Sequence, residues 1–377
     1  MMKICMLVTN SLKKDPRVQK EAMLAHMNEF NVTVLGTHDK NFDENYLKEL
    51  PYNTWIYPLP PKYRGYFKSK IKKFLRMWLP IYNITKQCIK IKPDIIHAND
   101  FDTLPAAYIA SIFTKSKIVY DSHEIYTGMP QLKSMNFIRN IITIIERFII
   151  RRVDHVVSVS NAAADVLAKK YKIKRPSVVT NCPFYSKKEE LMEKNPDFEV
   201  IYQGIMSPHR GYEEYVESAK YLDNNINLVL RGFGSIEDKL RKYIDDNELN
   251  NKVKFDTPVE ISELVGFASK SHVGVILTKP VSDNFKYTVS NKIFECIQAR
   301  IPVILSNVPE HVYLNNKYEF GFVLDSVTPL DISKAINSLN SDKSLYNKLK
   351  DNAIKAAEVL CWEIEGVKLI QIYNNLK

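Results

Sequence analysis

The segment from Tyr287 to Glu295 combines a cation, a carboxylate and small polar residues at helical spacing. Ser290 and Asn291 lie near an expected helix start, where their side chains and the free amides can face an anion. Lys292 adds a positive charge on the first turn, and Glu295 follows three residues later on the same helix face. A carboxylate accepts two hydrogen bonds, which suits the two hydroxyls of a ribose. The segment therefore predicts a site for phosphate and ribose, with a solvated Lys–Glu pair as the alternative.

An arginine and several glycines follow the first two strands expected in the carboxy-terminal half. Arg210 stands just before a predicted helix, so its donor fork and the helix amides can meet a diphosphate together. Gly204 follows the first strand, and Arg231 and Gly232 come at the end of the second. Glycine allows a tight turn and a close backbone approach to a ligand, although an ordinary strand-to-helix turn explains it equally well. We predict that these four residues bind phosphate.

His123 follows an expected strand in the amino-terminal half, in the run Asp121-Ser122-His123-Glu124. A histidine beside carboxylates after a buried strand is a candidate for binding a hydroxylated ligand. A histidine whose hydrogen bonds are satisfied by its neighbours is the alternative. We predict that His123 is catalytic.

The loop after the first expected strand is polar and lacks a Gly-x-Gly-x-x-Gly motif, so a dinucleotide cofactor is not indicated. Asp15 and Pro16 fit a helix start, because aspartate caps free amides and proline at the first helical position sacrifices no hydrogen bond. The loop could face an acceptor substrate or simply lead into the capped helix. We predict acceptor contacts for the polar residues Asn10, Ser11, Asp15 and Arg17.

Two series of alternating strands and helices must position these residues. This alternation specifies parallel sheets covered by helices on both faces, with ligands at the carboxyl ends of the strands. The expected strands are residues 3–9, 32–36, 94–98, 117–121, 155–160 and 177–181, then 199–203, 227–231, 253–255, 274–278 and 302–306. The expected helices are residues 15–28, 102–113, 136–152 and 161–171, then 212–222, 236–246, 261–269, 289–299, 341–359 and 362–376.

The predicted fold class is therefore α/β, with two Rossmann-like domains that face each other across a cleft. A length of 377 residues also favours two domains. We expect an amino-terminal domain at 1–187, a carboxy-terminal domain at 188–360, and a helix at 361–377 that packs back on the first domain. The charged stretch 186–197 lacks a strand pattern, and we place the linker there.

Composition excludes several classes of protein. The five cysteines are far apart and form no Cys-x-x-Cys pair, so zinc, iron–sulfur and disulfide frameworks are not expected. The apolar start of the chain is too short for a signal-peptide core, and no window approaches the roughly 18 apolar residues of a membrane span. We expect a cytoplasmic protein without a metal.

Charge is unevenly distributed along the chain. Residues 1–187 carry 30 Lys and Arg against 15 Asp and Glu, whereas the remainder carries 23 against 28. No acidic residue occurs from 50 to 93, where aromatic residues are interleaved with lysine and arginine. Residues 137–152, FIRNIITIIERFIIRR, form a second amphipathic segment. Either segment could lie on an anionic bilayer, which predicts peripheral attachment to the inner membrane face, with a solvated surface helix as the alternative.

Short motifs, in order along nearly the whole chain, give the sequence a resemblance to the family 4 glycosyltransferases of the GT-B fold. They are Asp15-Pro16-Arg17-Val18 with Glu21-Ala22, His97-Ala98-Asn99-Asp100, Asp121-Ser122-His123-Glu124, Val159-Ser160-Asn161, Asn181-Cys182-Pro183, Gly204 with Arg210-Gly211, and Ser290-Asn291-Lys292-Ile293-Phe294-Glu295. The resemblance implies a retaining enzyme that takes a sugar from a nucleoside-diphosphate sugar, with no metal and no bound cofactor.

The resemblance also implies residue roles. Arg210 and Lys292 would bind the diphosphate, Glu295 the ribose, and Ser290 and Asn291 would lie against the phosphates. His123 would contact the donor sugar near the reaction centre. The sequence departs from the family at two positions: Tyr287 stands where a Glu-x7-Glu motif begins, and Ile205 replaces the usual arginine after Gly204.

The predicted function is transfer of a sugar to a lipid-linked or polysaccharide acceptor in the synthesis of cell-surface glycans. We expect front-face displacement, with Arg210, Lys292 and helix amides stabilising the leaving diphosphate. A nucleotide-sugar 2-epimerase of the same fold and a non-catalytic sugar-nucleotide sensor are alternatives. A basic nucleic-acid-binding protein is a third, although no helix-turn-helix, zinc-finger or RNP motif is present.

Overall fold

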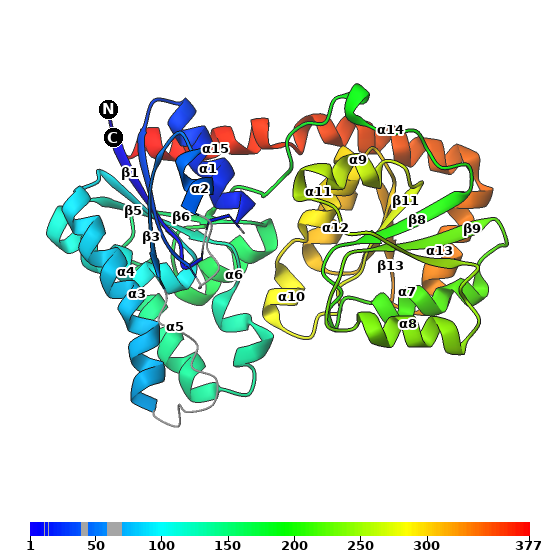
Figure 1. The fold of residues 1–377 in the computed structure, drawn as a ribbon, viewed down its shortest axis with the longest axis horizontal. Helices are drawn as coiled ribbons and strands as arrows, with labels where there is room; N and C mark the ends of the chain where they lie inside the picture. The colour runs from blue at the N-terminus through cyan, green and yellow to red at the C-terminus, as the bar shows by residue number, and fades with distance from the viewer. Residues whose placement is uncertain (11, 14, 39–43, 59–69) are drawn as a thin grey trace. The chain divides into compact units, whose positions relative to one another are not determined.

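The structure is a computed structural model that describes residues 1–10, 12–13, 15–38, 44–58 and 70–377. It divides into two compact units. Unit 1 comprises Met1–Thr180 and Gly366–Lys377, and unit 2 comprises Asn181–Glu365. In each unit, helices cover both faces of one parallel sheet (Figure 1).

Unit 1 is built on a seven-stranded parallel sheet with the order β3-β2-β1-β4-β5-β6-β7. Its strands are β1 (Lys3–Leu7), β2 (Asn31–His38), β3 (Asn53–Pro58), β4 (Ile95–Asn99), β5 (Lys117–Ser122), β6 (His155–Ser158) and β7 (Ser177–Val178). Its helices are α1 (Pro16–Met27), α2 (Glu44–Lys48), α3 (Lys70–Ile91), α4 (Asp100–Thr114), α5 (Asn136–Ile150) and α6 (Asn161–Tyr171). The order reverses between β1 and β4, where a doubly wound fold binds its ligands.

Unit 2 is built on a six-stranded sheet with the order β10-β9-β8-β11-β12-β13. Its strands are β8 (Phe198–Gln203), β9 (Ile226–Arg231), β10 (Val253–Asp256), β11 (Val273–Ile276), β12 (Val303–Ser306) and β13 (Gly321–Leu324). Its helices are α7 (Tyr212–Ser218), α8 (Glu237–Asp246), α9 (Leu264–Ala268), α10 (Asp283–Tyr287), α11 (Asn291–Gln298), α12 (Pro309–Tyr318), α13 (Pro329–Ser341) and α14 (Lys343–Val359). Here the order reverses between β8 and β11.

The central strands are apolar on both sides because helices cover both faces of the sheet. All five residues of β4 are buried, as are all four of β11 and of β12. Helix α1 begins as the sequence predicts: the Asp15 carboxylate accepts a hydrogen bond from the Val18 amide, and Pro16 takes the first helical position.

The predicted α/β class with two Rossmann-like domains is confirmed. The division falls after Thr180, seven residues before the predicted boundary. The stretch 186–197, predicted as a linker, belongs to unit 2, because its backbone and side chains bond the segment after α9. The Met192 amide donates to Ser269 Oγ at 2.9 Å, and Lys194 Nζ donates to the Ser271 carbonyl at 2.5 Å.

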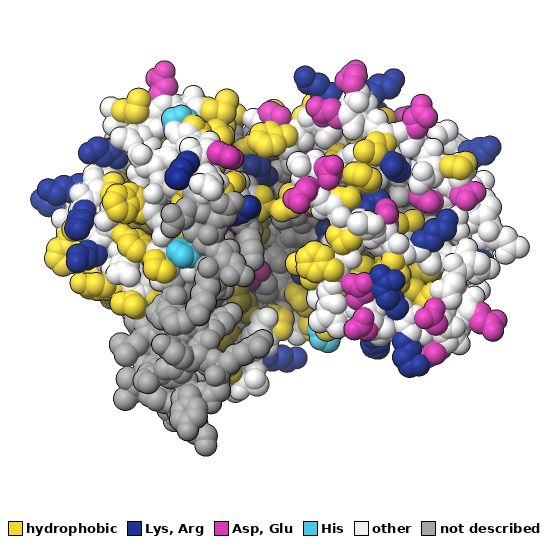
Figure 2. All heavy atoms as spheres, in the orientation of Figure 1, with side chains coloured by type: hydrophobic (Ala, Val, Ile, Leu, Met, Phe, Trp, Pro, Cys, Tyr) yellow, Lys and Arg dark blue, Asp and Glu magenta, His cyan; other side chains and the backbone are white. Residues whose placement is uncertain are grey.

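The final helix, α15 (Trp362–Asn375), starts in unit 2, and its larger part, from Gly366, clusters with unit 1. On the face drawn in Figure 2, basic side chains predominate over the described part of unit 1, and both signs are mixed over unit 2. Within the described residues, no helix is both long enough and apolar enough to cross a bilayer.

Candidate functional site

Residues from three segments meet at the carboxyl ends of β8 and β11 in unit 2. Gly204 follows β8 directly, and Thr278 lies two residues beyond β11. Because β8 and β11 are neighbours at the point where strand order reverses, no crossover connection covers the gap between their ends. Arg210 and Lys292 both reach this point, as their contacts show.

Arg210 is held by residues from two other segments. Its Nη1 donates to Thr278 Oγ1 at 3.1 Å, and its guanidinium carbon lies 4.3 Å from the centre of the Phe285 ring. The Tyr202 hydroxyl donates to the Arg210 carbonyl at 2.5 Å and fixes the backbone below the side chain. Stacking on an aromatic ring leaves the remaining edge of a guanidinium available for an anion.

Lys292 lies against Gly204 and two stacked tyrosines. Its Nζ donates to the Tyr212 hydroxyl at 3.1 Å and lies 5.2 Å from the centre of the Tyr202 ring. Burial and the positive charge of Arg210 lower the pKa of Lys292 to about 8. Arg210 and Lys292 therefore act on each other electrostatically, and an anion that bound both would relieve this repulsion.

The start of α11 places the other residues that the sequence singled out near Lys292. Ser290 is the N-cap residue, but its side chain makes no capping hydrogen bond, and Asn291 opens the helix on the exposed side. Glu295 accepts a hydrogen bond from Gln203 Nε2 at 2.6 Å, which ties it to the end of β8. Glu295 and Lys292 therefore both reach the carboxyl end of β8, next to Gly204. This agrees with the prediction that the two side chains share one face of the helix.

The loops after β8 and β9 touch backbone to backbone. The Gly204 amide donates to the Arg231 carbonyl at 2.7 Å. A Cβ atom at Gly232 would lie 2.1 Å from the Gly204 carbonyl oxygen, and one at Gly204 would lie 2.4 Å from Lys292 Cε. Both glycines also have positive φ angles, 110° at Gly204 and 140° at Gly232. Only glycine fits these two positions.

Arg231 makes an ion pair with Asp256, and a phosphate contact from it stays a prediction. It is 3% exposed, and its Nε and Nη2 donate to Asp256 Oδ2 at 3.2 and 2.5 Å. Its guanidinium carbon also lies 5.3 Å from the Phe267 ring centre. Because Asp256 ends the neighbouring strand β10, this ion pair ties the ends of β9 and β10 together. The sequence showed the arginine but not its carboxylate partner.

The corresponding end of unit 1 holds a buried network of charged side chains. Arg17 Nη2 donates to both oxygens of Asp121, at 2.8 and 2.7 Å, and its Nε donates to Glu21 Oε1 at 2.8 Å. Arg17 is 5% exposed and its side chain makes this internal ion pair, so an acceptor contact from it stays a prediction. Against the effect of burial, Arg17 and His123 hold the pKa of Asp121 well below its usual range.

His97 completes the network and was not among the predicted site residues. Its Nε2 lies 3.6 Å from Asp121 Oδ2 and 3.7 Å from Glu21 Oε2. Glu21, His97 and Asp121 are buried, and their ligand atoms lie within 4.8 Å of one another, close enough to hold a metal ion. The Arg17 guanidinium already bonds both carboxylates and supplies the positive charge that they need.

His123 lies at the edge of this network. Its Nδ1 is 3.2 Å from Asp100 Oδ2, its Nε2 is 3.6 Å from Asp121 Oδ2, and its amide donates to Asp100 Oδ1 at 2.9 Å. Burial and Arg17 oppose protonation, but Asp100 and Asp121 outweigh them and raise the pKa of His123 well above its ordinary value. The His123 side chain is 15% exposed, but its Nε2 is buried and has no hydrogen-bond partner among the described residues, so a ligand contact from His123 stays a prediction.

The first loop of unit 1 is held by its own polar side chains. Asn10 Nδ2 donates to Asp15 Oδ2 at 2.7 Å, and Asn10 Oδ1 accepts from the Leu12 amide at 2.9 Å. Asp15 also caps α1. Both residues are half-buried and shape the loop, so an acceptor contact from them stays a prediction. Ser11 lies outside the described residues.

Two family models together match residues 23–183 and 185–356. The first is described as Glycosyltransferase Family 4 and the second as Glycosyl transferases group 1. The chain belongs to the family 4-type glycosyltransferases of the GT-B fold.

Known members and structures agree with this assignment. RfbU of Salmonella typhimurium, an O-antigen chain mannosyltransferase, is 24% identical over 169 residues, which are 44% of this chain and 46% of RfbU. The match thus spans less than half the length of this relative. The structure of Anabaena HepE in complex with UDP and glucose superposes with a TM-score of 0.77 and 14% identity over all of both chains. Sucrose-phosphate synthase from Thermosynechococcus elongatus gives 0.75 and 14%, over 100% of this chain and 99% of its own. At this identity, the two structures establish the fold.

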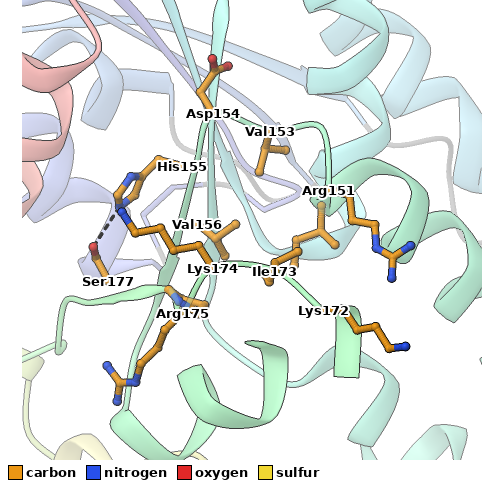
Figure 3. Close-up of a pocket in the computed structure, with 12 residues that line it drawn as sticks. Arg151, Val153, Asp154, His155, Val156, Lys172, Ile173, Lys174, Arg175 and Ser177 are labelled. Atoms are coloured by element: carbon orange, nitrogen blue, oxygen red, sulfur yellow. Dashed lines mark hydrogen bonds between the residues drawn. The ribbon is translucent and has the colours of Figure 1, made fainter. Parts of the chain in front are cut away.

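This GT-B chain also has a cavity away from the predicted site residues. A cavity of about 530 Å³ lies at the amino-terminal ends of β6 and β7 in unit 1, lined among others by His155 and Ser177 (Figure 3). Because the sheet is parallel, this is the edge opposite to His123. A second cavity, of about 370 Å³, lies at the amino-terminal edge of the sheet of unit 2, beside Phe198 and His272.

Proposed function

We propose that the protein is a retaining glycosyltransferase that takes a sugar from a nucleoside-diphosphate sugar. The observation that carries the proposal is the convergence of Arg210 and Lys292 at the ends of β8 and β11 in unit 2. Two mutually repelling cations beside a glycine backbone suit a diphosphate, which offers several charged oxygens to one site. Glu295 on α11 accepts a hydrogen bond from Gln203 at the end of β8, and its carboxylate suits the ribose hydroxyls.

The proposed reaction is front-face displacement. The bond between the anomeric carbon and the diphosphate breaks as the acceptor hydroxyl arrives on the same face, and the departing phosphate takes the proton of that hydroxyl. Arg210, Lys292 and the first amides of α11 stabilise the charge that develops on the leaving diphosphate. His123 donates to the donor sugar near the reaction centre. No metal takes part, so a chelator should leave turnover unchanged.

Relatives support the choice of donor and acceptor. HepE binds UDP and, in a further structure, UDP-glucose, and RfbU is a mannosyltransferase of the O-antigen chain. For this chain we propose a nucleoside-diphosphate hexose as the donor and a lipid-linked or polysaccharide acceptor in cell-surface glycan synthesis. The position of Tyr287, in place of a glutamate, bears on which sugar is accepted.

Thermal unfolding with a panel of nucleoside diphosphates and their sugars tests the donor. A ligand at a hundred times its Kd should stabilise the folded protein by about 2.7 kcal/mol. Lys292→Ala and Arg210→Ala should each remove this stabilisation and, once an acceptor is found, reduce turnover by about a hundredfold or more. Lys242→Ala is the matched control, since Lys242 is an exposed partner of Asp246 on α8. Unchanged stabilisation in the Lys292 variant would refute the site.

Two enzymatic or binding alternatives use the same residues. A nucleotide-sugar 2-epimerase would convert the donor without an acceptor, so incubation with the nucleotide sugar alone and separation of isomers distinguishes it. A sugar-nucleotide sensor would bind the same ligand without turnover. A nucleic-acid-binding protein remains the alternative from another class, favoured by the excess of basic residues in 1–187. This alternative predicts that the protein is retained on duplex DNA or RNA and that retention weakens as the salt concentration rises. No such retention is expected of a glycosyltransferase.

We also propose peripheral attachment to an anionic membrane on the cytoplasmic side, through the outward face of α5. Phe137, Ile144 and Phe148 are 78%, 67% and 49% exposed, and their spacing of seven and four residues places them on one face of the helix. The one acidic residue of α5, Glu146, is 1% exposed and accepts hydrogen bonds from the hydroxyls of Tyr120 and Tyr171. The exposed side chains of α5 are therefore apolar, cationic or neutral and polar, with no carboxylate among them, which suits an anionic bilayer.

Vesicle flotation tests this attachment. The protein should float with vesicles that contain phosphatidylglycerol and stay behind with pure phosphatidylcholine, and Ile144→Glu should abolish flotation. Exposed Val367→Glu, on α15, is the control. The basic stretch 50–93 was the other predicted membrane segment, and its residues 59–69 lie outside the described residues. A wild-type protein that ignored anionic vesicles would end the proposal.

A further inference from the structure

The cavity at the amino-terminal ends of β6 and β7, named here the basic pocket, has an apolar floor and a cationic rim. It measures about 530 Å³. Figure 3 shows Val153, Val156 and Ile173 lying between two groups of positively charged side chains. The rim residues are Arg151, Lys172, Lys174 and Arg175. Such a lining suits a ligand with an anionic head and an apolar body.

The two aspartates near the rim, Asp154 and Asp165, already have partners. Asp154 is bound to Lys117 Nζ and to the Ile118 amide, both at 2.9 Å, and Asp165 is paired with Arg175 Nε at 2.6 Å. Within the described part of the chain, no ion pair joins a carboxylate to Arg151, Lys172 or Lys174. Together with burial, the charge of Lys174 lowers the pKa of His155, so the positive potential extends onto the floor of the pocket.

The basic pocket lies at the carboxy-terminal end of α5. Ile150, the last residue of that helix, and Arg151 both line the pocket. The guanidinium of the next residue, Arg152, lies 3.7 Å from the centre of the exposed Phe148 ring. Apolar side chains that could enter a bilayer and cations that could meet its headgroups therefore follow one another along a single stretch of chain.

We propose that the basic pocket binds the phosphate of an anionic phospholipid headgroup while the outward face of α5 lies in the bilayer. The phosphate would lie on the cationic rim, and the apolar floor would take the first carbons of the lipid. This inference rests on the membrane attachment proposed above and adds a defined lipid site to it. The pocket lies at the sheet edge away from His123, so its loss should leave donor binding unchanged.

The test compares three proteins: wild type, Lys172→Glu/Lys174→Glu, and the control Lys239→Glu/Lys242→Glu. The control residues are exposed on α8 in unit 2 and undergo the same change of charge. Dihexanoyl phosphatidylglycerol below its micelle concentration should bind the wild type saturably with one-to-one stoichiometry. A lysine near an anionic surface contributes about 1 kcal/mol, so flotation with phosphatidylglycerol vesicles should weaken at least tenfold in the pocket variant and less than twofold in the control.

The arms of this experiment separate the possible results. If the wild type floats and both double variants float equally well, the membrane attachment stands and the lipid site is overturned. Another result would be that inorganic phosphate stabilises the wild type but not the pocket variant, while none of the three proteins floats with vesicles. In that case the pocket binds a free phosphate, and the lipid assignment is overturned. If the short-chain lipid does not saturate, the attraction is diffuse and the site is overturned as well.

Discussion

The hydroxyl of Tyr373, near the end of α15, lies 2.6 Å from Nδ1 of His97 on β4. Both side chains are fully buried, and the opposite nitrogen of His97 faces Asp121, whose carboxylate lies between Arg17 and His123. A tyrosine that donates to Nδ1 fixes the proton of a neutral imidazole on Nε2, where it points toward the carboxylates. A series of polar contacts thus joins the carboxy-terminal helix to the predicted catalytic histidine.

Replacing Tyr373 with phenylalanine should therefore change His97 and, through it, His123. The ring still packs against Phe30, 5.8 Å away between ring centres, but one buried hydrogen bond is lost. We expect the free energy of unfolding to fall by about 1–2 kcal/mol. The 15N chemical shifts of labelled histidine should report a tautomer change at His97 and an altered titration of His123. Tyr221→Phe, at a half-exposed site in unit 2, is the control. Identical histidine spectra would contradict the coupling.

The buried ion pair of Arg17 should be important for stability. Arg17→Gln leaves Asp121 and Glu21 buried without their guanidinium, and breaking such a pair from one side costs about 3–5 kcal/mol. Arg241→Gln breaks an exposed pair with Glu237 on α8 and should cost less than about 1 kcal/mol. Urea unfolding measures both. Equal midpoints for the two variants would mean that the Arg17 network is not needed for folding.

Gly204→Ala should displace Lys292 from its place. A Cβ atom there would lie 2.4 Å from Lys292 Cε, and the φ angle of 110° strains any other residue. We expect a loss of about 1–3 kcal/mol in stability and at least a tenfold loss of affinity for the nucleoside diphosphate that binds the wild type. Gly266→Ala is a matched control, because its Cβ would meet nothing closer than 3.4 Å. Calorimetric titration of both variants decides the matter, and full affinity in the Gly204 variant would contradict the prediction.

Lys292→Met should stabilise the protein at neutral pH while removing diphosphate binding. Burial and Arg210 lower the pKa of Lys292 from 10.5 to about 8, so below pH 8 the folded protein holds a charge in an unfavourable place. The shift corresponds to at most about 3 kcal/mol. Between pH 8 and 10.5 the unfolded chain binds this proton and the folded protein does not, so the wild type gains stability as pH rises. The difference in melting temperature between Lys292→Met and the wild type should therefore shrink as the pH rises from 8 to 10.5. A difference that stayed constant over this range would contradict the lowered pKa of Lys292.

The hydrophobic pattern of the sequence predicted the fold because each central strand is a short apolar run followed by a helix. The edge strands of the two sheets were harder to predict. Strand β3 is half-exposed along its length, so it has neither the continuous apolar pattern of a central strand nor a clear alternation. Strand β13 begins at Gly321, where a Cβ atom would lie 1.9 Å from the Val303 carbonyl oxygen, and a glycine there weakens the strand signal.

The candidate site was predictable wherever its residues are close in sequence. Ser290 to Glu295 lie on one helix, and spacing alone placed Lys292 and Glu295 on one face. The sequence predicts an acceptor contact for Arg17, because it follows a polar loop, and a ligand contact for Arg231, because it ends a strand beside a glycine. Their ion-pair partners, Asp121 and Asp256, lie 104 and 25 residues away and are brought near only by the sheet order.

The backbone contact between Gly204 and Gly232 limits how this scaffold can diversify. No side chain can be added at either glycine, because its first carbon would collide with the Gly204 carbonyl oxygen at Gly232 and with the Lys292 side chain at Gly204. A change of sugar preference must come from positions free to vary, and the segment 283–289, which ends just before the α11 cap and includes Tyr287, offers them. A mutant library of Lys286 and Tyr287, with Phe285 kept because its ring stacks on Arg210, would sample new specificities without changing the residues proposed to bind the diphosphate.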